Sequence, residues 1–100
     1  MTMHGIEVPQ ERLATLCRAN GIRRLALFGS ALRADFRPES DLDLLVEFEP
    51  GRRVGLAFIR LQDDLSRLLG RTVDLHTPAS LSRHFRAAVL SEAETLYVAA

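Results

Sequence analysis

The sequence predicts a small α/β domain, with a mixed sheet of three to four strands and helices packed mainly on one face. Short apolar runs bounded by glycine or proline, at residues 22–28, 41–48 and 72–76, indicate buried strands. The second and third strands are separated by a helix long enough for a parallel crossover, whereas the first connection holds little more than one helical turn. We therefore expect an antiparallel pair followed by a parallel pair, within one domain spanning residues 1–100.

The N-terminal part is predicted to hold a helix, a strand and a short helix. Residues 9–20 begin with a proline, place apolar side chains on one side and end before a glycine, as amphipathic helices do. The first strand, residues 22–28, follows directly. Ser30 then interrupts the apolar pattern, and we expect it to cap a short helix over residues 31–34.

The C-terminal part continues with a strand, a long helix, a strand and a last helix. Pro50-Gly51 ends the second strand in a turn, and residues 54–69 repeat apolar side chains at steps of three and four until Gly70. After the third strand, a last helix begins at Pro78 or Ser80, and residues 95–98 form a short closing strand. We expect that helix to face inward with Leu81, Phe85, Ala88 and Val89.

Composition excludes several classes of protein. The 100 residues carry 13 basic and 13 acidic side chains, so the net charge is zero and the chain lacks the bulk attraction of a basic domain for nucleic acid. No apolar run approaches the roughly 20 residues that cross a bilayer, and the first nine residues lack the pattern of a secretory signal. We expect a cytoplasmic protein with no membrane partner, and no internal disulfide from the single Cys17.

Three carboxylates are predicted to meet at one edge of the sheet. Asp41 and Asp43 are two residues apart in the second strand, so they share a face and lie about 6.6 Å apart along it, while Asp74 lies in the third strand. Oxygen ligands of this kind favour Mg²⁺ or Mn²⁺, and three of them suit a two-metal site for displacement at phosphorus. A strand that merely begins with solvated acids is the alternative interpretation of an isolated Asp-x-Asp.

Residues just after the first strand are candidates for binding phosphate. Gly29 permits close approach of the backbone to a ligand, and Ser30 offers either an ordinary helix cap or a hydroxyl for a phosphate oxygen. Arg33, one helical turn further, is placed either to reach a phosphate or to face solvent. An anionic ligand would thus be held locally, at a loop.

These motifs together carry a family resemblance. Gly29-Ser30, ten intervening residues and Asp41-x-Asp43 resemble the signature of the DNA polymerase beta-like nucleotidyltransferases. The surrounding segments 27–31, 36–48 and 70–75 resemble the minimal nucleotidyltransferase (MNT) family in particular, over nearly the whole chain. The resemblance implies the polymerase beta palm-like fold.

The resemblance also implies an activity. Gly29, Ser30 and Arg33 would bind the nucleotide, while Asp41, Asp43 and Asp74 would bind two Mg²⁺ ions, with Mn²⁺ as a substitute, and carry out catalysis. MNT proteins act as antitoxins that transfer AMP from ATP to a tyrosine of a HEPN-domain ribonuclease toxin. This chain is thus expected to AMPylate a cognate HEPN toxin and to assemble with that toxin or with itself.

Two other functions remain open at the level of sequence. One is the same chemistry with a small-molecule acceptor, and the other is a non-catalytic module that blocks a toxin by contact. His76 shares a face with Asp74, at a position where the resembling family more often has an aliphatic residue. We interpret it, like His4 and His84, as a histidine without a functional role.

Overall fold

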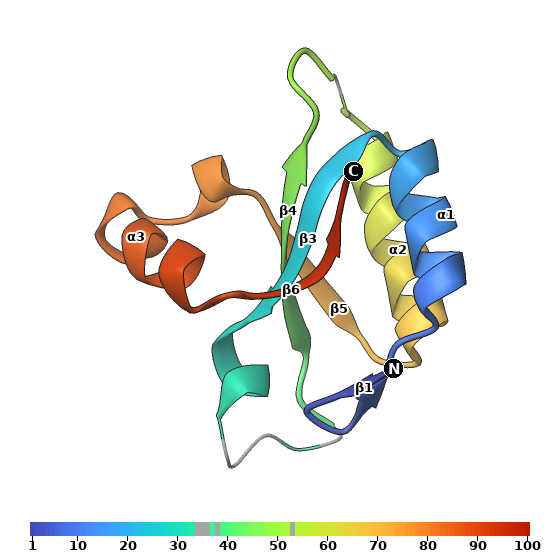
Figure 1. The fold of residues 1–100 in the computed structure, drawn as a ribbon. Coiled ribbons are helices and arrows are strands. Elements are labelled where there is room, and N and C mark those ends of the chain that lie inside the picture. Colours follow the sequence, from blue (N-terminus) through green and yellow to red (C-terminus); the bar gives the residue numbers. More distant parts are fainter. Residues whose placement is uncertain (34–36, 38, 53) are drawn as a thin grey trace.

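The computed structural model describes residues 1–33, 37, 39–52 and 54–100. A four-stranded sheet, in the order β5-β4-β3-β6, forms its centre (Figure 1). The strands are β3 (Ile22–Phe28), β4 (Leu42–Phe48), β5 (Val73–His76) and β6 (Glu94–Val98). β4 runs antiparallel to β3 and parallel to β5, as the lengths of the connections predicted, and β6 adds an antiparallel strand beside β3.

Two helices, α1 (Gln10–Ala19) and α2 (Ala57–Leu69), cover one face of the sheet (Figure 1). The alternation of β4 turns Leu42, Leu44 and Val46 toward this layer, where all three are fully buried. Burial of these branched side chains between helices and sheet forms the main core. Within the described ranges, no helix combines the length and the apolar character needed to cross a membrane.

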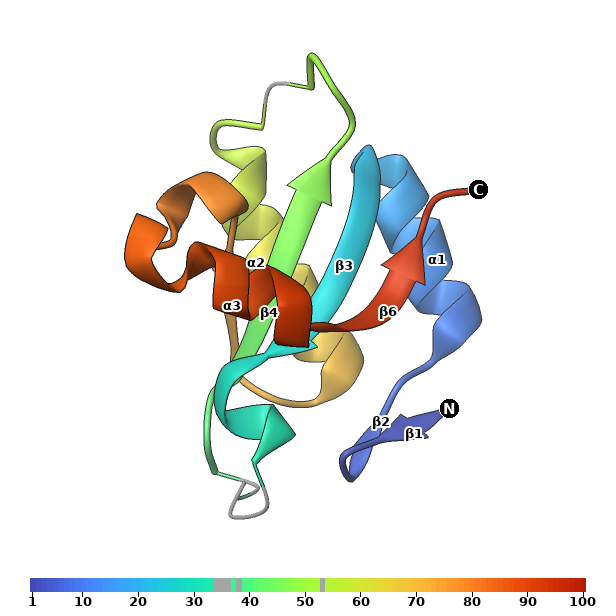
Figure 2. The same cartoon turned by 60° about the vertical axis from the view of Figure 1, so that its left-hand side comes forward.

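The last helix, α3 (Arg83–Glu92), stands on the other side of the sheet, after the short 3₁₀ turn η2 (Pro78–Ser80) (Figure 2). The prediction that Phe85 and Ala88 face inward is wrong, because Phe85 is 65% exposed and Ala88 is also exposed. No residue of α3 is buried. The sheet face on this side carries Asp43 and Asp74, so it offers the helix less apolar surface than the face under α1 and α2.

A short hairpin at the N-terminus was not predicted. β1 (Thr2–Met3) and β2 (Ile6–Glu7) pair antiparallel around a two-residue loop. Strands of two residues are too short to show an alternating pattern, so periodicity does not reveal them. The imidazole of His4 in the loop contacts the carboxylate of Glu94 at the start of β6, and this contact connects the hairpin to the edge of the sheet.

Candidate active site

The register of the central strands brings two of the predicted carboxylates together. In the parallel pair of β4 and β5, Asp43 lies directly opposite Asp74, and Asp43 is also paired with Phe28 of β3. Side chains alternate along a strand, so Asp43 projects from the face opposite to Leu42 and Leu44. The two acids therefore lie on the sheet face away from α1 and α2. β5 is an edge strand, which leaves the Asp74 side chain 55% exposed.

His76 lies between these two acids. Its Nε2 atom is 3.4 Å from Oδ1 of Asp43 and 3.2 Å from Oδ2 of Asp74. One potential ligand atom from each of the three residues lies within 4.8 Å of the others, so the three side chains are close enough to share a metal ion. The imidazole packs edge-on against the ring of Phe28, with 5.3 Å between centroids, and this contact orients it.

The sequence analysis placed His76 on the face of Asp74 but assigned it no functional role. The available signal was its position two residues after Asp74, which places both side chains on one face of β5. That signal did not show which residues of β4 lie beside Asp74 and His76. The register, with His76 beside Leu45 and Asp74 beside Asp43, supplies that information.

The pKa of Asp43 depends on its burial and on the charged groups around it. Burial raises the pKa of the Asp43 carboxyl above its ordinary value, because the charged form loses solvation. The neighbouring His76 lowers the pKa, whereas the negative charges of Asp74 and Asp41 raise it. Asp43 is thus a carboxylate whose ionised form would be stabilised by an additional positive charge.

Asp41 lies apart from the three-residue group. It precedes β4 and is exposed, although its charge still acts on Asp43. The chain before it is held by Arg71, whose guanidinium donates hydrogen bonds to the carbonyl oxygens of Arg37, at 2.8 Å, and Ser40, at 3.0 Å. Arg71 therefore positions the entrance to β4, a role that its place in the sequence did not indicate.

Gly29 contacts Asp43 from the end of β3. Its φ is +73°, and a Cβ atom at this position would lie 2.6 Å from Oδ2 of Asp43. A side chain is therefore unfavourable for two reasons, the backbone conformation and the adjacent carboxylate, which would have to move. The glycine that sequence analysis assigned to phosphate binding lies directly against one of the predicted metal ligands.

Ser30 and Arg33 follow in and after the 3₁₀ turn η1 (Gly29–Leu32). The expected cap is wrong, because the turn begins at Gly29 and has no side-chain cap, while the carbonyl of Ser30 accepts a hydrogen bond from the Arg33 N–H at 3.0 Å. Ala34, the end of the expected helix, lies outside the described residues. Ser30 is half-buried beside Gly29, and Arg33 is exposed.

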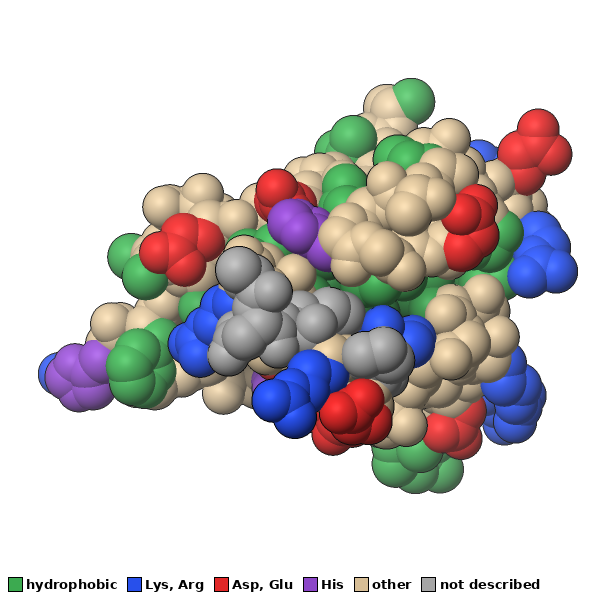
Figure 3. Space-filling view, turned by 90° about the horizontal axis from the view of Figure 1, so that it is seen from below, with side chains coloured by type: hydrophobic (Ala, Val, Ile, Leu, Met, Phe, Trp, Pro, Cys, Tyr) green, Lys and Arg blue, Asp and Glu red, His purple; other side chains and the backbone are tan. Residues whose placement is uncertain are grey.

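The surface at this end of the molecule carries charges of both signs. Viewed from below (Figure 3), acidic and basic side chains are interspersed among the described residues, without a continuous basic face. This distribution agrees with the zero net charge of the chain. It favours recognition of a small anion by individual groups over binding of a polyanion.

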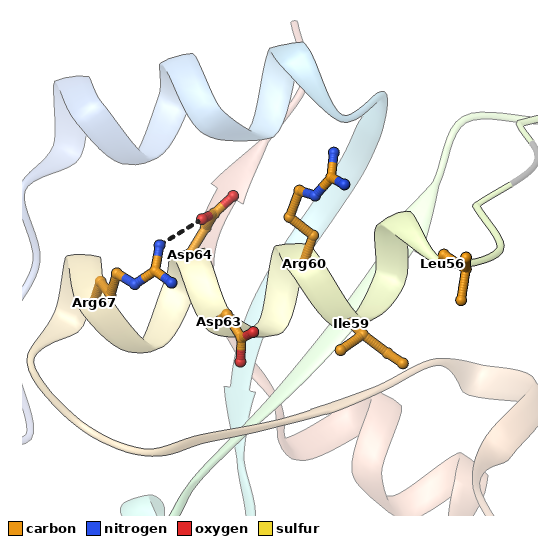
Figure 4. Close-up of a pocket in the computed structure, with 6 residues that line it drawn as sticks. All are labelled: Leu56, Ile59, Arg60, Asp63, Asp64 and Arg67. Carbon is orange, nitrogen blue, oxygen red and sulfur yellow. Dashed lines mark hydrogen bonds and ion pairs between the residues drawn. The ribbon is translucent and has the colours of Figure 1, made fainter.

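A hollow on α2 is separate from the carboxylates (Figure 4). Residues of α2 and of the turn before it line the hollow, and Arg67 and Asp64 form an ion pair of 3.5 Å there. None of the predicted site residues is among its lining, which consists of Leu56, Ile59, Arg60, Asp63, Asp64 and Arg67. The hollow belongs to the outer side of the helical layer, across the sheet from Asp43 and Asp74.

Comparison with known proteins identifies the fold and the family. Residues 11–96 match the sequence profile of the nucleotidyltransferase domain. The chain belongs to this family. Protein adenylyltransferase MntA of Thermococcus cleftensis is 40% identical over 72 residues, which cover 72% of each protein.

A solved structure agrees with this assignment and shows that the chain is a minimal nucleotidyltransferase. One structure, itself assigned provisionally as a minimal nucleotidyltransferase, is 43% identical, with a TM-score of 0.69 and coverage of 84% of this chain and 85% of the other. The crystal structure of a toxin–antitoxin with AMP-PNP has a TM-score of 0.70 at 23% identity, covering 92% and 75% of the two chains. At that identity the likeness concerns the fold alone.

Proposed function

We propose that this minimal nucleotidyltransferase is a metal-dependent antitoxin that transfers AMP from ATP to a tyrosine hydroxyl of a cognate HEPN ribonuclease toxin. The observation that supports this best is the alignment of Asp43 with Asp74 across β4 and β5, with Gly29 packed against Asp43. Potential metal ligands thus lie beside a residue that carries no side chain, which supports binding of a phosphate at this point.

The residues fit a divalent cation. The carboxylates of Asp43 and Asp74 converge, and burial and like charge both disfavour ionised Asp43 unless a cation compensates. Asp41, Asp43 and Asp74 would hold Mg²⁺ or Mn²⁺. When bound, such an ion supplies positive charge that stabilises the negative charge developing on the phosphate oxygens.

The protein's own groups would bind and orient the nucleotide. Gly29 carries no side chain and is half-buried next to Asp43, so its backbone would approach a phosphate, and the neighbouring Ser30 would offer a hydroxyl to a phosphate oxygen. Arg33 is exposed just beyond η1 and would pair with the triphosphate. These contacts would hold the α-phosphorus near the carboxylates, and such positioning accounts for much of the catalysis of phosphoryl transfer.

The transfer step conserves atoms and charge. The acceptor oxygen forms a bond to the α-phosphorus of ATP, the bond from that phosphorus to the bridging oxygen breaks, and pyrophosphate leaves. Asp74 would take the proton of the acceptor hydroxyl, since it is the more exposed of the two paired acids, at 55% against 27% for Asp43. Its place on the edge strand β5 leaves it accessible to a large acceptor.

One relative and one protein of similar fold support a protein acceptor in a toxin–antitoxin system. The Thermococcus cleftensis relative is named a protein adenylyltransferase. A protein of similar fold is a toxin–antitoxin that was crystallised with AMP-PNP, an analogue of ATP. An exposed acid at the sheet edge suits a tyrosine presented by another protein.

The direct test combines the chain, ATP, Mg²⁺ and the candidate toxin, with intact mass as the readout. We expect the toxin to gain the mass of AMP, and peptide mapping to place it on tyrosine. Asp43→Asn should lower the rate by at least about a hundredfold. Asp63→Asn, in the hollow of α2, is the matched control and should leave the rate unchanged.

Several outcomes would contradict the proposal. An unchanged toxin mass would exclude protein AMPylation under these conditions, and transfer to a metabolite in the absence of any partner would indicate a small-molecule acceptor. Full protection against the toxin by Asp43→Asn, without transfer, would indicate that the protein acts by binding alone.

A further inference from the structure

The position of the His76 imidazole suits a metal ligand better than a hydrogen-bonding partner. Its Nε2 atom is buried and has no hydrogen-bond partner in the described part of the chain, although Asp43 and Asp74 both lie nearby. Both contacts lie within ion-pair distance and are ion pairs only when the imidazole is protonated. A buried polar atom without a partner is unfavourable, so its position between two carboxylates requires an explanation.

The distances match those between ligands of a single ion. Two donors bound at right angles to one ion, each at about 2.1 Å, lie about 3.0 Å apart. The observed separations from Nε2 are 3.4 Å to Asp43 and 3.2 Å to Asp74. A small inward movement of the three side chains would bring all donors to coordination distance from a common point.

We propose that His76 is a ligand of the same metal ion as Asp43 and Asp74, and that it shifts the preference of this site from Mg²⁺ toward first-row transition-metal ions such as Mn²⁺. This inference rests on the metal site in the proposed function. It adds a nitrogen ligand and a metal selectivity that the three aspartates alone would not provide.

The selectivity follows from the chemistry of the donors. Mg²⁺ strongly prefers oxygen ligands and gives up bound water reluctantly, so replacing a water by imidazole gains it little. First-row transition-metal ions accept imidazole nitrogen more readily, and their affinity for mixed nitrogen and oxygen sites rises from Mn²⁺ toward Cu²⁺. Mn²⁺ is a useful probe because it is also a common substitute for Mg²⁺ at oxygen-rich sites.

The experiment measures Mn²⁺ binding by electron paramagnetic resonance, without ATP or partner. We expect electron spin-echo modulation from a coordinated ¹⁴N in the unmodified protein, and a change in that modulation when histidine is labelled with ¹⁵N. His76→Leu should abolish the modulation and weaken Mn²⁺ binding at least about tenfold. Mg²⁺ affinity, measured by competition, should change by less than about threefold.

Controls separate a ligand from a residue that only supports the fold. His84→Leu makes the same change on exposed α3 and should leave the ¹⁴N modulation and Mn²⁺ affinity intact. His76 packs on Phe28, so His76→Asn is a second variant, with a smaller polar side chain. The spectrum of the unmodified protein tests coordination even where both variants fold poorly.

Two results would overturn the inference: the absence of nitrogen modulation in the unmodified protein with Mn²⁺ bound, and an equal loss of Mn²⁺ and Mg²⁺ affinity in His76→Leu. The second would mean that His76 only positions the carboxylates. Neither readout depends on AMP transfer. Coordination without transfer would refute the proposed function alone, and transfer without coordination would refute only this inference.

Discussion

Replacing Gly29 with alanine tests the contact between the end of β3 and the candidate active site. The new Cβ atom would lie 2.6 Å from Oδ2 of Asp43, and 3.3 Å from its Cβ and Cγ. An ordinary contact begins at 3.4 Å. The carboxylate of Asp43 or the backbone of Gly29 must therefore move by about 0.8 Å for the variant to fold.

Two separate effects are expected from this substitution. The φ of +73° places alanine in the left-handed region, which costs roughly 1–2 kcal/mol of stability. Displacement of Asp43 adds a further loss that depends on how easily its side chain rotates. For AMP transfer, misplacing a reacting group by about 1 Å can lower the rate by about a hundredfold.

Gly51→Ala is the matched control. Gly51 has a φ of +80°, close to that of Gly29, but nothing lies within 4 Å of the Cβ that alanine would add. In urea denaturation both variants should lose the stability that backbone strain removes, and Gly29→Ala should lose more because it also displaces Asp43. Only Gly29→Ala should also weaken metal binding and slow AMP transfer, measured on folded protein at saturating ATP.

The comparison between these variants can refute the reasoning. Equal metal affinity and equal transfer rates in Gly29→Ala and Gly51→Ala would mean that Asp43 does not need its observed position. Unchanged stability in both variants would mean that the left-handed backbone at these glycines is not retained in solution.

Two further predictions concern the core. Leu65→Ala, at a fully buried position of α2, should lower the free energy of unfolding by about 2–5 kcal/mol, measured by urea denaturation. Ile59→Ala, at a position 59% exposed, should change it by less than about 0.5 kcal/mol. Similar losses in the two variants would contradict the observed orientation of α2. Burial raises the pKa of the Cys17 thiol to about 12, so this covered, neutral thiol should react with a disulfide reagent at about pH 8 only after unfolding. Rapid labelling of native protein would contradict this prediction.

Local patterns in the sequence were sufficient to locate most of the elements. The first strand was predicted at residues 22–28, and β3 spans Ile22–Phe28. The predicted helix 54–69 ends where α2 ends, before Gly70, and its first three residues form the preceding turn instead. These boundaries depend on side-chain periodicity and on glycine conformations, both of which are properties of short segments.

Strand directions were also predictable, because they follow from the lengths of the connections. A helix of about four turns between β4 and β5 permits a parallel crossover. In its described residues, the connection between β3 and β4 contains only the short turn η1, which is too short for a parallel crossover. The orientation of α3 was not predictable in this way. Its apolar residues suggested a buried face, but no residue of α3 is buried on this side of the sheet.

The sequence by itself determined which residues share a strand face, because side chains alternate with a period of two along any strand. It therefore separated Asp43 from Leu42 and Leu44, and grouped Asp74 with His76. Only the tertiary structure decided that Asp43 lies opposite Asp74, that Gly29 packs against Asp43, and that His76 lies between the acids. The alternating pattern fixes which face a residue occupies, but a shift of two residues between β4 and β5 would preserve that face, and these strands are joined by a helix rather than by a short turn that would set the register.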